Sequence, residues 1–122
     1  PDSDATLERA FAAGVSQIWL PNCNSATIPG MMAQEERYPE RIFPMMGLHP
    51  TYVNTELERE LELVEEWLRK RPFLAVGEIG LDYYWDLSFV EEQKIAFRHQ
   101  LQLASQYRLP ISIHSRSGNG LN

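Results

Sequence analysis

The sequence has few of the features that mark secreted or membrane-spanning proteins. It contains one cysteine, Cys23, so no internal disulfide can form, which suits a reducing compartment. It has no run of about 18 apolar residues, the length at which a membrane span becomes a candidate. Its first residues, PDSDATLERAF, are acidic rather than a basic and apolar leader. We therefore expect a cytoplasmic protein without membrane segments.

Positive charge is also scarce. The 11 Lys and Arg residues face 17 Asp and Glu residues, which leaves a net charge of −6. This balance excludes a general basic surface that would neutralise many phosphates, so any contact with nucleic acid must be local. What the sequence does have is 43% apolar residues over 122 positions, enough for one core. We predict a single domain over 1–122, with 116–122 as a flexible tail.

Helical and strand-like patterns alternate along the chain. Capping-box pairs, Thr55 with Glu58 and Ser88 with Glu91, precede two of the helical segments. The predicted helices cover 4–13, 27–38, 55–71 and 88–108, and the predicted strands cover 15–21, 42–48, 73–82 and 109–116. Strict alternation of this kind indicates right-handed βαβ crossovers and a parallel sheet, in either an open doubly wound fold or a closed (β/α)8 barrel.

The segment 73–82, FLAVGEIGLD, is the most informative stretch. Its apolar and glycine residues predict a strand buried on both faces, yet Glu78 lies within it. Counting in steps of two puts Val76, Glu78 and Asp82 on one side and Ile79 on the other. An ionised carboxylate in a buried strand costs several kcal/mol unless a cation or hydrogen bonds compensate. Either a metal ion lies beside Glu78, or the strand is ending there and the carboxylate meets water or backbone N–H groups.

Polar residues mark the C-terminal ends of all four predicted strands. Parallel strands bring these ends to one rim, where doubly wound sheets and (β/α)8 barrels both bind ligands. In strand order, the residues are Asn22 and Asn24, His49, Glu78 and Asp82, and His114 and Arg116. The last strand also separates Ile111 and Ile113 on one side from its polar residues on the other. The sequence therefore predicts a functional site at this rim.

The residue types at the rim favour a metal site. His114 can offer a neutral imidazole nitrogen, and Glu78 can offer one oxygen or bridge two ions, although two ligands are too few to hold a catalytic ion tightly. Arg116 is the only basic residue at the rim, and a guanidinium there suits a phosphate or a carboxylate. His49 precedes a proline at a strand end. It either contacts substrate or caps backbone groups of its own loop.

Three further features carry expectations. Gln93 lies on the predicted buried stripe of helix 88–108, so we expect its amide to bond a neighbouring strand or loop. The aromatic run 83–85 either stacks on a base or sugar or packs as a lid over the site. Cys23 is expected to be a small buried side chain rather than a nucleophile, because nothing in the sequence pairs it with a base. The other predicted members of the stripe are Val90, Phe97, Leu101 and Ala104.

Several of these motifs together resemble the TatD family of metal-dependent deoxyribonucleases. They are MMGLHP at 45–50, AVGEIGLDYYWD at 75–86, Gln93 with Phe97 and the following QLQLA, and LPISIHSR at 109–116. The resemblance implies a (β/α)8 barrel of the amidohydrolase type that binds two divalent ions, of the Mg, Mn or Zn type, and hydrolyses phosphodiesters at DNA ends. By motif, Glu78 resembles the catalytic carboxylate that bridges the two metals, and His114 resembles a metal-binding histidine. His49, Arg116 and Asp82 look like substrate-side residues, with His49 also a candidate for catalysis.

The sequence also departs from the family pattern. The family begins with a strand that carries a His-x-His metal pair and supplies a later histidine and a late aspartate, and this chain has no counterpart of them. We therefore expect about four of the eight βα units, with further metal ligands outside this chain and sheet edges open to self-association. The leading hypothesis is a TatD-like deoxyribonuclease. The alternatives are a metal hydrolase of small esters or amides, and an inactive partial barrel that acts as a binding or assembly module.

Overall fold

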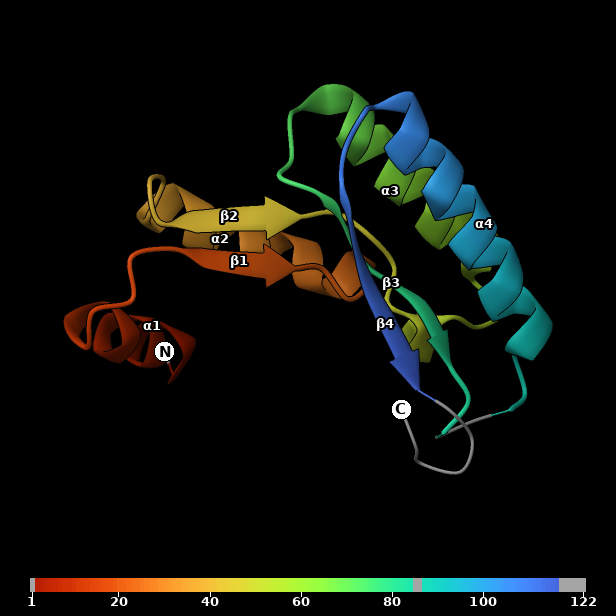
Figure 1. Ribbon diagram of the computed structural model, residues 1–122, viewed down its shortest axis with the longest axis horizontal. Helices are drawn as coiled ribbons and strands as arrows, with labels where there is room; N and C mark the ends of the chain where they lie inside the picture. Colours follow the sequence, from red (N-terminus) through yellow and green to blue (C-terminus); the bar gives the residue numbers. More distant parts are fainter. Residues whose placement is uncertain (1, 85–86, 117–122) are drawn as a thin grey trace.

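The computed structural model describes residues 2–84 and 87–116, in which helices and strands alternate as predicted (Figure 1). Two parts of the predictions lie outside the described residues. They are Trp85, from the aromatic run, and residues 117–122, from the predicted tail. The main elements are α1 (Asp2–Ala12), β1 (Ile18–Pro21), α2 (Ile28–Arg37), β2 (Ile42–Met45), α3 (Leu57–Lys70), β3 (Val76–Asp82), α4 (Val90–Gln106) and β4 (Ile111–Arg116). Two short 3-10 helices, η1 (Ser25–Thr27) and η2 (Pro50–Tyr52), follow β1 and β2.

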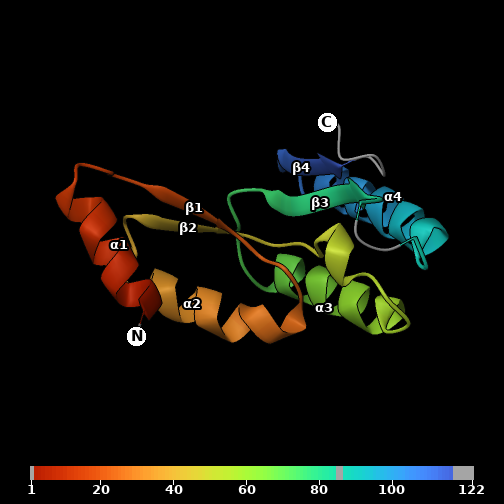
Figure 2. The same cartoon turned by 90° about the horizontal axis from the view of Figure 1, so that it is seen from below.

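The four strands are parallel and follow one another in chain order. β1 pairs with β2, β3 pairs with β4, and a parallel bridge between Met46 and Val76 joins the two pairs. In Figure 2 the strands run above α1, α2 and α3. A doubly wound sheet reverses its strand order at a switch point, whereas a (β/α)8 barrel adds each strand next to the previous one. The order seen here is that of a barrel wall, and it decides between the two architectures that the sequence left open.

The N-cap residues of α3 and α4 differ from those predicted. The N-cap residues of α3 and α4 are Glu56 and Phe89, and neither makes a side-chain capping hydrogen bond. The entry to α3 is held instead by Asn54, whose side-chain oxygen accepts the backbone N–H of Glu56 at 2.8 Å. The N-cap function predicted for Thr55 was therefore wrong, because an Asx turn from Asn54 sets the start of α3 two residues later than predicted. The N-cap position of α4 is taken by Phe89 and not by Ser88 as predicted.

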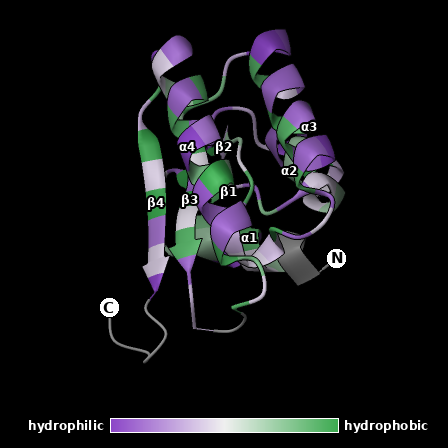
Figure 3. Cartoon of the chain, turned by 90° about the vertical axis from the view of Figure 1, so that its right-hand side faces the viewer, coloured by the Kyte–Doolittle hydropathy of each residue, from purple (hydrophilic) through white to green (hydrophobic). Residues whose placement is uncertain are grey.

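The core lies between the strands and the inner faces of the helices. Its buried members include Met46, Leu48, Val64, Val76 and Ile79. Hydrophilic residues occupy the outward faces of α3 and α4 (Figure 3). Within the part of the chain that the structure describes, no helix combines the length and the apolar character needed to cross a membrane.

The buried face of α4 differs from the predicted stripe. Ala104 and Gln93 are buried as predicted, whereas Val90, Phe97 and Leu101 are only half-buried. The buried stripe differs from the predicted one because a neighbouring row of side chains faces β3. The fully buried residues of α4 are Gln93, Ala96, Gln100, Leu103 and Ala104.

The strand β3 is irregular at Glu78. Val76 lies opposite Ile111 and Ile79 lies opposite Ile113, so three steps along β3 match two steps along β4. The extra residue is a β-bulge, which bends a strand and re-aims a side chain. Val76 and Ile79 consequently pack into the same core, and the prediction that they occupy opposite faces was wrong. Glu78, at the third position of β3, lies within this bulge rather than at the strand end.

The outer strands carry apolar side chains on their exposed faces. On β4 the predicted alternation is present, with Ser112, His114 and Arg116 half-buried, but Ile113 is 53% exposed. On β1, Trp19 is 60% exposed. Within the described part of the chain, the apolar face of β4 is therefore exposed.

Candidate metal centre

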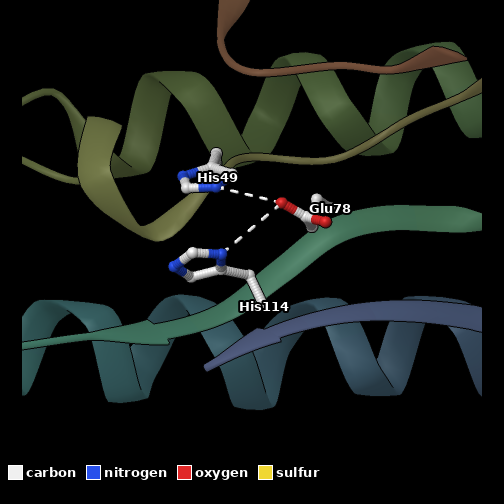
Figure 4. A group of neighbouring side chains, drawn as sticks. All are labelled: His49, Glu78 and His114. Carbon is white, nitrogen blue, oxygen red and sulfur yellow. Dashed lines mark ion pairs between the residues drawn. The ribbon is translucent and has the colours of Figure 1, made fainter. Parts of the chain in front are cut away.

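Three side chains from separate segments meet around one carboxylate oxygen (Figure 4). His49 Nε2 lies 3.1 Å from Glu78 Oε1, and His114 Nδ1 lies 3.7 Å from the same oxygen. His49 comes from the loop after β2, Glu78 from the bulge of β3 and His114 from β4. One ligand atom from each residue lies within 4.8 Å of the others, the spacing of a metal-binding group. The predicted meeting of Glu78 and His114 is confirmed, and His49 joins them.

A buried carboxylate holds the far side of the His114 ring. Asp82 is 3% exposed, its Oδ2 lies 2.8 Å from His114 Nε2, and its Oδ1 accepts the backbone N–H of Tyr84 at 2.9 Å. Burial acts to raise the pKa of Asp82, but these hydrogen bonds and the charges of His114 and Arg116 outweigh it and hold the pKa below its ordinary value. An ionised carboxylate can only accept, so His114 Nε2 carries the proton. Nδ1, the other ring nitrogen, faces Glu78 and is the atom that can bind a metal once it is unprotonated.

The outer nitrogen of His49 faces a different partner. His49 is the N-cap of η2, and its Nδ1 accepts the backbone N–H of Thr51 at 3.2 Å, with Thr51 Oγ1 at 2.8 Å. Burial and the neighbouring His114 imidazole lower the pKa of His49, against the opposing effect of Glu78, so the ring is neutral at pH 7. A backbone N–H can only donate, which leaves the ring proton on Nε2. His49 therefore caps its own loop, one of the two predicted alternatives, and donates towards Glu78.

The donor set fits a divalent ion held by Glu78 and His114. Carboxylate oxygen and imidazole nitrogen are ligands of Zn²⁺ and related ions. With metal–ligand distances near 2.1 Å, two ligands of one ion lie at most about 4.3 Å apart. The 3.7 Å between Glu78 Oε1 and His114 Nδ1 is within this limit and too long for a hydrogen bond. The 3.1 Å between His49 and Glu78 is instead a hydrogen-bond distance.

Two buried glutamines of α4 fix the backbone that carries these residues. Gln93 accepts the backbone N–H of Asp82 at 2.8 Å and donates to its carbonyl at 2.9 Å, as expected for a buried amide. Gln100 makes the same pair of bonds to Leu48, the residue before His49, at 2.7 and 3.3 Å. The contact of Gln100 was not predicted from the sequence. Its position seven residues after Gln93, and so on the same helix face, is the signal that could have found it.

The polar residues after β1 have a structural function. Asn22 is 1% exposed and donates to the carbonyls of Asn24 at 3.0 Å and Gly47 at 3.1 Å, while its own side-chain oxygen accepts the Thr27 hydroxyl at 2.7 Å. Asn24 caps η1. These bonds tie the end of β1 to the loop that leads to His49. The side-chain amide of Asn22 is thus engaged on both its nitrogen and its oxygen within these loops.

Cys23 is half-buried rather than fully buried as expected. Burial and the Glu78 carboxylate raise the pKa of its thiol, so it is neutral at pH 7. Its carbonyl accepts the backbone N–H of His49 at 2.9 Å. A raised pKa is the opposite of what a nucleophilic thiol needs, which agrees with the structural function expected for Cys23.

Arg116 lies at the end of β4, opposite Asp82. Its guanidinium carbon is 4.0 Å from the ring centroid of Tyr84, so the two side chains stack. The pairing places Arg116 at the rim beyond His114, as predicted. Its contact with phosphate and the substrate contacts of His49 and Asp82 stay predictions at this point.

Comparison with known proteins identifies the family. The family model described as TatD related DNase matches residues 1–120. A protein of Escherichia coli K12 named uncharacterized metal-dependent hydrolase YjjV is 37% identical over 94% of the chain and 45% of its own length. The 3'-5' ssDNA/RNA exonuclease TatD of Erwinia tasmaniensis is 30% identical over 97% of the chain and 46% of its own length.

Solved structures show the same relationship. The crystal structure of YjjV from Escherichia coli K12 superposes with a TM-score of 0.84 at 37% identity, and covers 94% of this chain and 45% of its own. A TatD family hydrolase from Entamoeba histolytica gives a TM-score of 0.73 at 28% identity, over 95% of this chain and 42% of its own. The chain spans about half the length of the relatives it matches, so its fold is part of a (β/α)8 barrel. By the match of the family model along its length, the chain belongs to the TatD related DNase family.

Proposed function

We propose that the protein is a metal-dependent hydrolase that cleaves phosphodiester bonds in nucleic acid. The observation that carries the proposal is the placement of Glu78 Oε1 and His114 Nδ1, 3.7 Å apart at the rim of parallel strands. Family membership supports it, and a relative named as a 3'-5' ssDNA/RNA exonuclease supports a single-stranded substrate attacked from its end. The acidic overall charge agrees with a substrate held at one local site rather than along a basic surface.

The metal would be held by Glu78 and His114. A divalent ion of the Mg, Mn or Zn type bound there would supply Lewis acidity towards the phosphodiester and its nucleophile. We propose a pair of such ions that share Glu78, with the remaining ligands outside the described residues. Asp82 fixes the ring of His114 so that Nδ1 faces the site.

Other residues of the chain act on the substrate directly. His49 is neutral and presents its Nε2–H into the site, where it can donate to an oxygen of the scissile phosphate. Arg116 provides a guanidinium at the rim for phosphate contact. Asp82 was predicted to bind substrate, but its carboxylate is buried and engaged with His114 and Tyr84. Its geometry supports a positioning role instead.

The test is Glu78→Ala in the protein expressed from its complete gene. Cleavage of a 5′-labelled single-stranded oligonucleotide is measured with Mn²⁺ and with EDTA, and loss of several kcal/mol of transition-state stabilisation predicts a fall of at least about a hundredfold. Glu62→Ala, on the exposed face of α3, is the matched control and should cleave normally. Full activity of Glu78→Ala, or cleavage that persists in EDTA, would contradict the proposal. Turnover of small esters or amides with no turnover of oligonucleotide would favour the alternative hydrolase.

A further inference from the structure

Tyr84 and Arg116 form a stacked pair next to the metal centre. The ladder between β3 and β4 pairs Gly80 with His114 and Asp82 with Arg116, and it continues with Tyr83 N–H donating to the Arg116 carbonyl at 2.9 Å. Arg116 therefore lies two residues beyond His114 on the same side of β4, a rise of about 6.6 Å. This displacement is on the scale of one nucleotide along a single strand.

One carboxylate fixes both the metal centre and this pair. Asp82 Oδ2 holds the His114 ring, and Asp82 Oδ1 holds the backbone of Tyr84. The Arg116 guanidinium stacks on the Tyr84 ring at 4.0 Å, and its charge also acts on Asp82. The His114 ring and the Tyr84 backbone are thus both held by hydrogen bonds to a single buried side chain.

We propose that Tyr84 and Arg116 form a subsite for the nucleotide next to the scissile phosphodiester, a proposal that rests on the proposed function. Tyr84 is 41% exposed although the guanidinium of Arg116 stacks on its ring. An aromatic ring beside an arginine is the combination by which proteins hold single-stranded nucleic acid, with the base stacked on the ring and the phosphate bound by the guanidinium. In this subsite Tyr84 receives the base and Arg116 the neighbouring phosphate.

The first test measures binding without cleavage. Every sample is the protein from its complete gene with Glu78→Gln, and the probe is a 5′-fluorescein-labelled single-stranded hexathymidylate followed by fluorescence anisotropy. Adding Tyr84→Leu should raise the Kd about fivefold or more, the effect of losing one base–aromatic stack. Tyr84→Phe keeps the ring and should restore the affinity. Leu87→Ala, at a 67% exposed position three residues further on, is the control for disturbance of the loop.

The second test separates a subsite from a purely structural role. Hexathymidylate has nucleotides on both sides of a phosphodiester, whereas bis(p-nitrophenyl) phosphate has a single phosphodiester and no nucleotide. In Tyr84→Leu, the ratio of kcat/KM for the oligonucleotide to kcat/KM for the small diester should fall about fivefold or more, mainly through KM. An equal fall for both substrates would show that Tyr84 only supports Asp82, and it would overturn the proposal.

The two proposals fail in different ways. If neither substrate is cleaved while Tyr84→Leu still weakens oligonucleotide binding, the proposed function is wrong, and Tyr84 and Arg116 bind a nucleotide without a scissile bond beside it. If the Kd of Tyr84→Leu equals that of its Glu78→Gln parent, the subsite is wrong whatever the activity.

Discussion

The side-chain amide of Gln100 bonds both the N–H and the C=O of Leu48, 52 residues away in the sequence. Both residues are 1% exposed. This contact fixes the backbone immediately before His49 to the middle of α4. The helix that covers β3 therefore also sets the position of a side chain from the loop after β2.

Gln100→Leu should destabilise the protein. The N–H and C=O of Leu48 would be left buried without partners, and the cost predicts a loss of about 2 to 4 kcal/mol in the free energy of unfolding. Urea unfolding followed by circular dichroism measures the loss. Gln102→Leu, on the exposed face of the same helix, is the control. Equal stability of the two variants would show that Gln100 does not hold the His49 loop.

The sequence predicted the elements that depend on pattern and connection length. The alternation of helices and strands placed the polar ends of four strands together, which is why Glu78 and His114 were expected to meet and do. A buried amide must find partners, which is why Gln93 was expected to bond a strand and does. These expectations need only periodicity and the parallel order of the strands.

Features that depend on non-local packing were not predictable in this way. The bulge at Glu78 arises from the register between β3 and β4, which no local pattern encodes. The Thr55 capping box is a valid local motif, but the turn at Asn54 sets the start of α3 instead. The apolar character of Ile113 predicts burial, but burial also requires a covering element, and none of the residues 2–84 and 87–116 covers it.

Asp82→Ala should weaken metal binding without removing a ligand. The His114 ring would lose the acceptor that holds Nε2–H and fixes the orientation of the ring. Loss of such a partner typically lowers metal affinity by about 10-fold to 100-fold. Isothermal titration calorimetry with Mn²⁺ measures the change. Glu91→Ala removes an exposed carboxylate that pairs with Lys94 at 3.2 Å, and it should bind metal normally. Unchanged affinity in Asp82→Ala would contradict the assigned role.

NMR can determine directly which ring nitrogens of His49 and His114 carry a proton. The chain has three histidines, and long-range ¹H–¹⁵N NMR of the metal-free protein labelled in its imidazoles should show the proton on Nε2 in both. Added Cd²⁺ should then shift Nδ1 of His114 and leave Nδ1 of His49 bound to Thr51. His99→Gln, on the outer part of α4, removes the third signal for assignment. An unprotonated Nε2 in His114 would contradict the arrangement described for Asp82.

Gly80 and Gly30 offer opposite outcomes for the same substitution. Gly80 has a φ of +142°, and a Cβ there would lie 1.9 Å from the carbonyl oxygen of His114. Gly80→Ala should therefore force β3 away from β4 and cost about 4 kcal/mol or more. Gly30 lies in α2 with no atom within 4 Å of its Cβ position, so Gly30→Ala should stabilise the helix by about 0.5 to 1 kcal/mol. Thermal unfolding of the two variants tests the pair. Because β4 carries His114, a tolerated alanine at Gly80 would mean that the close approach of the two strands does not position the metal centre.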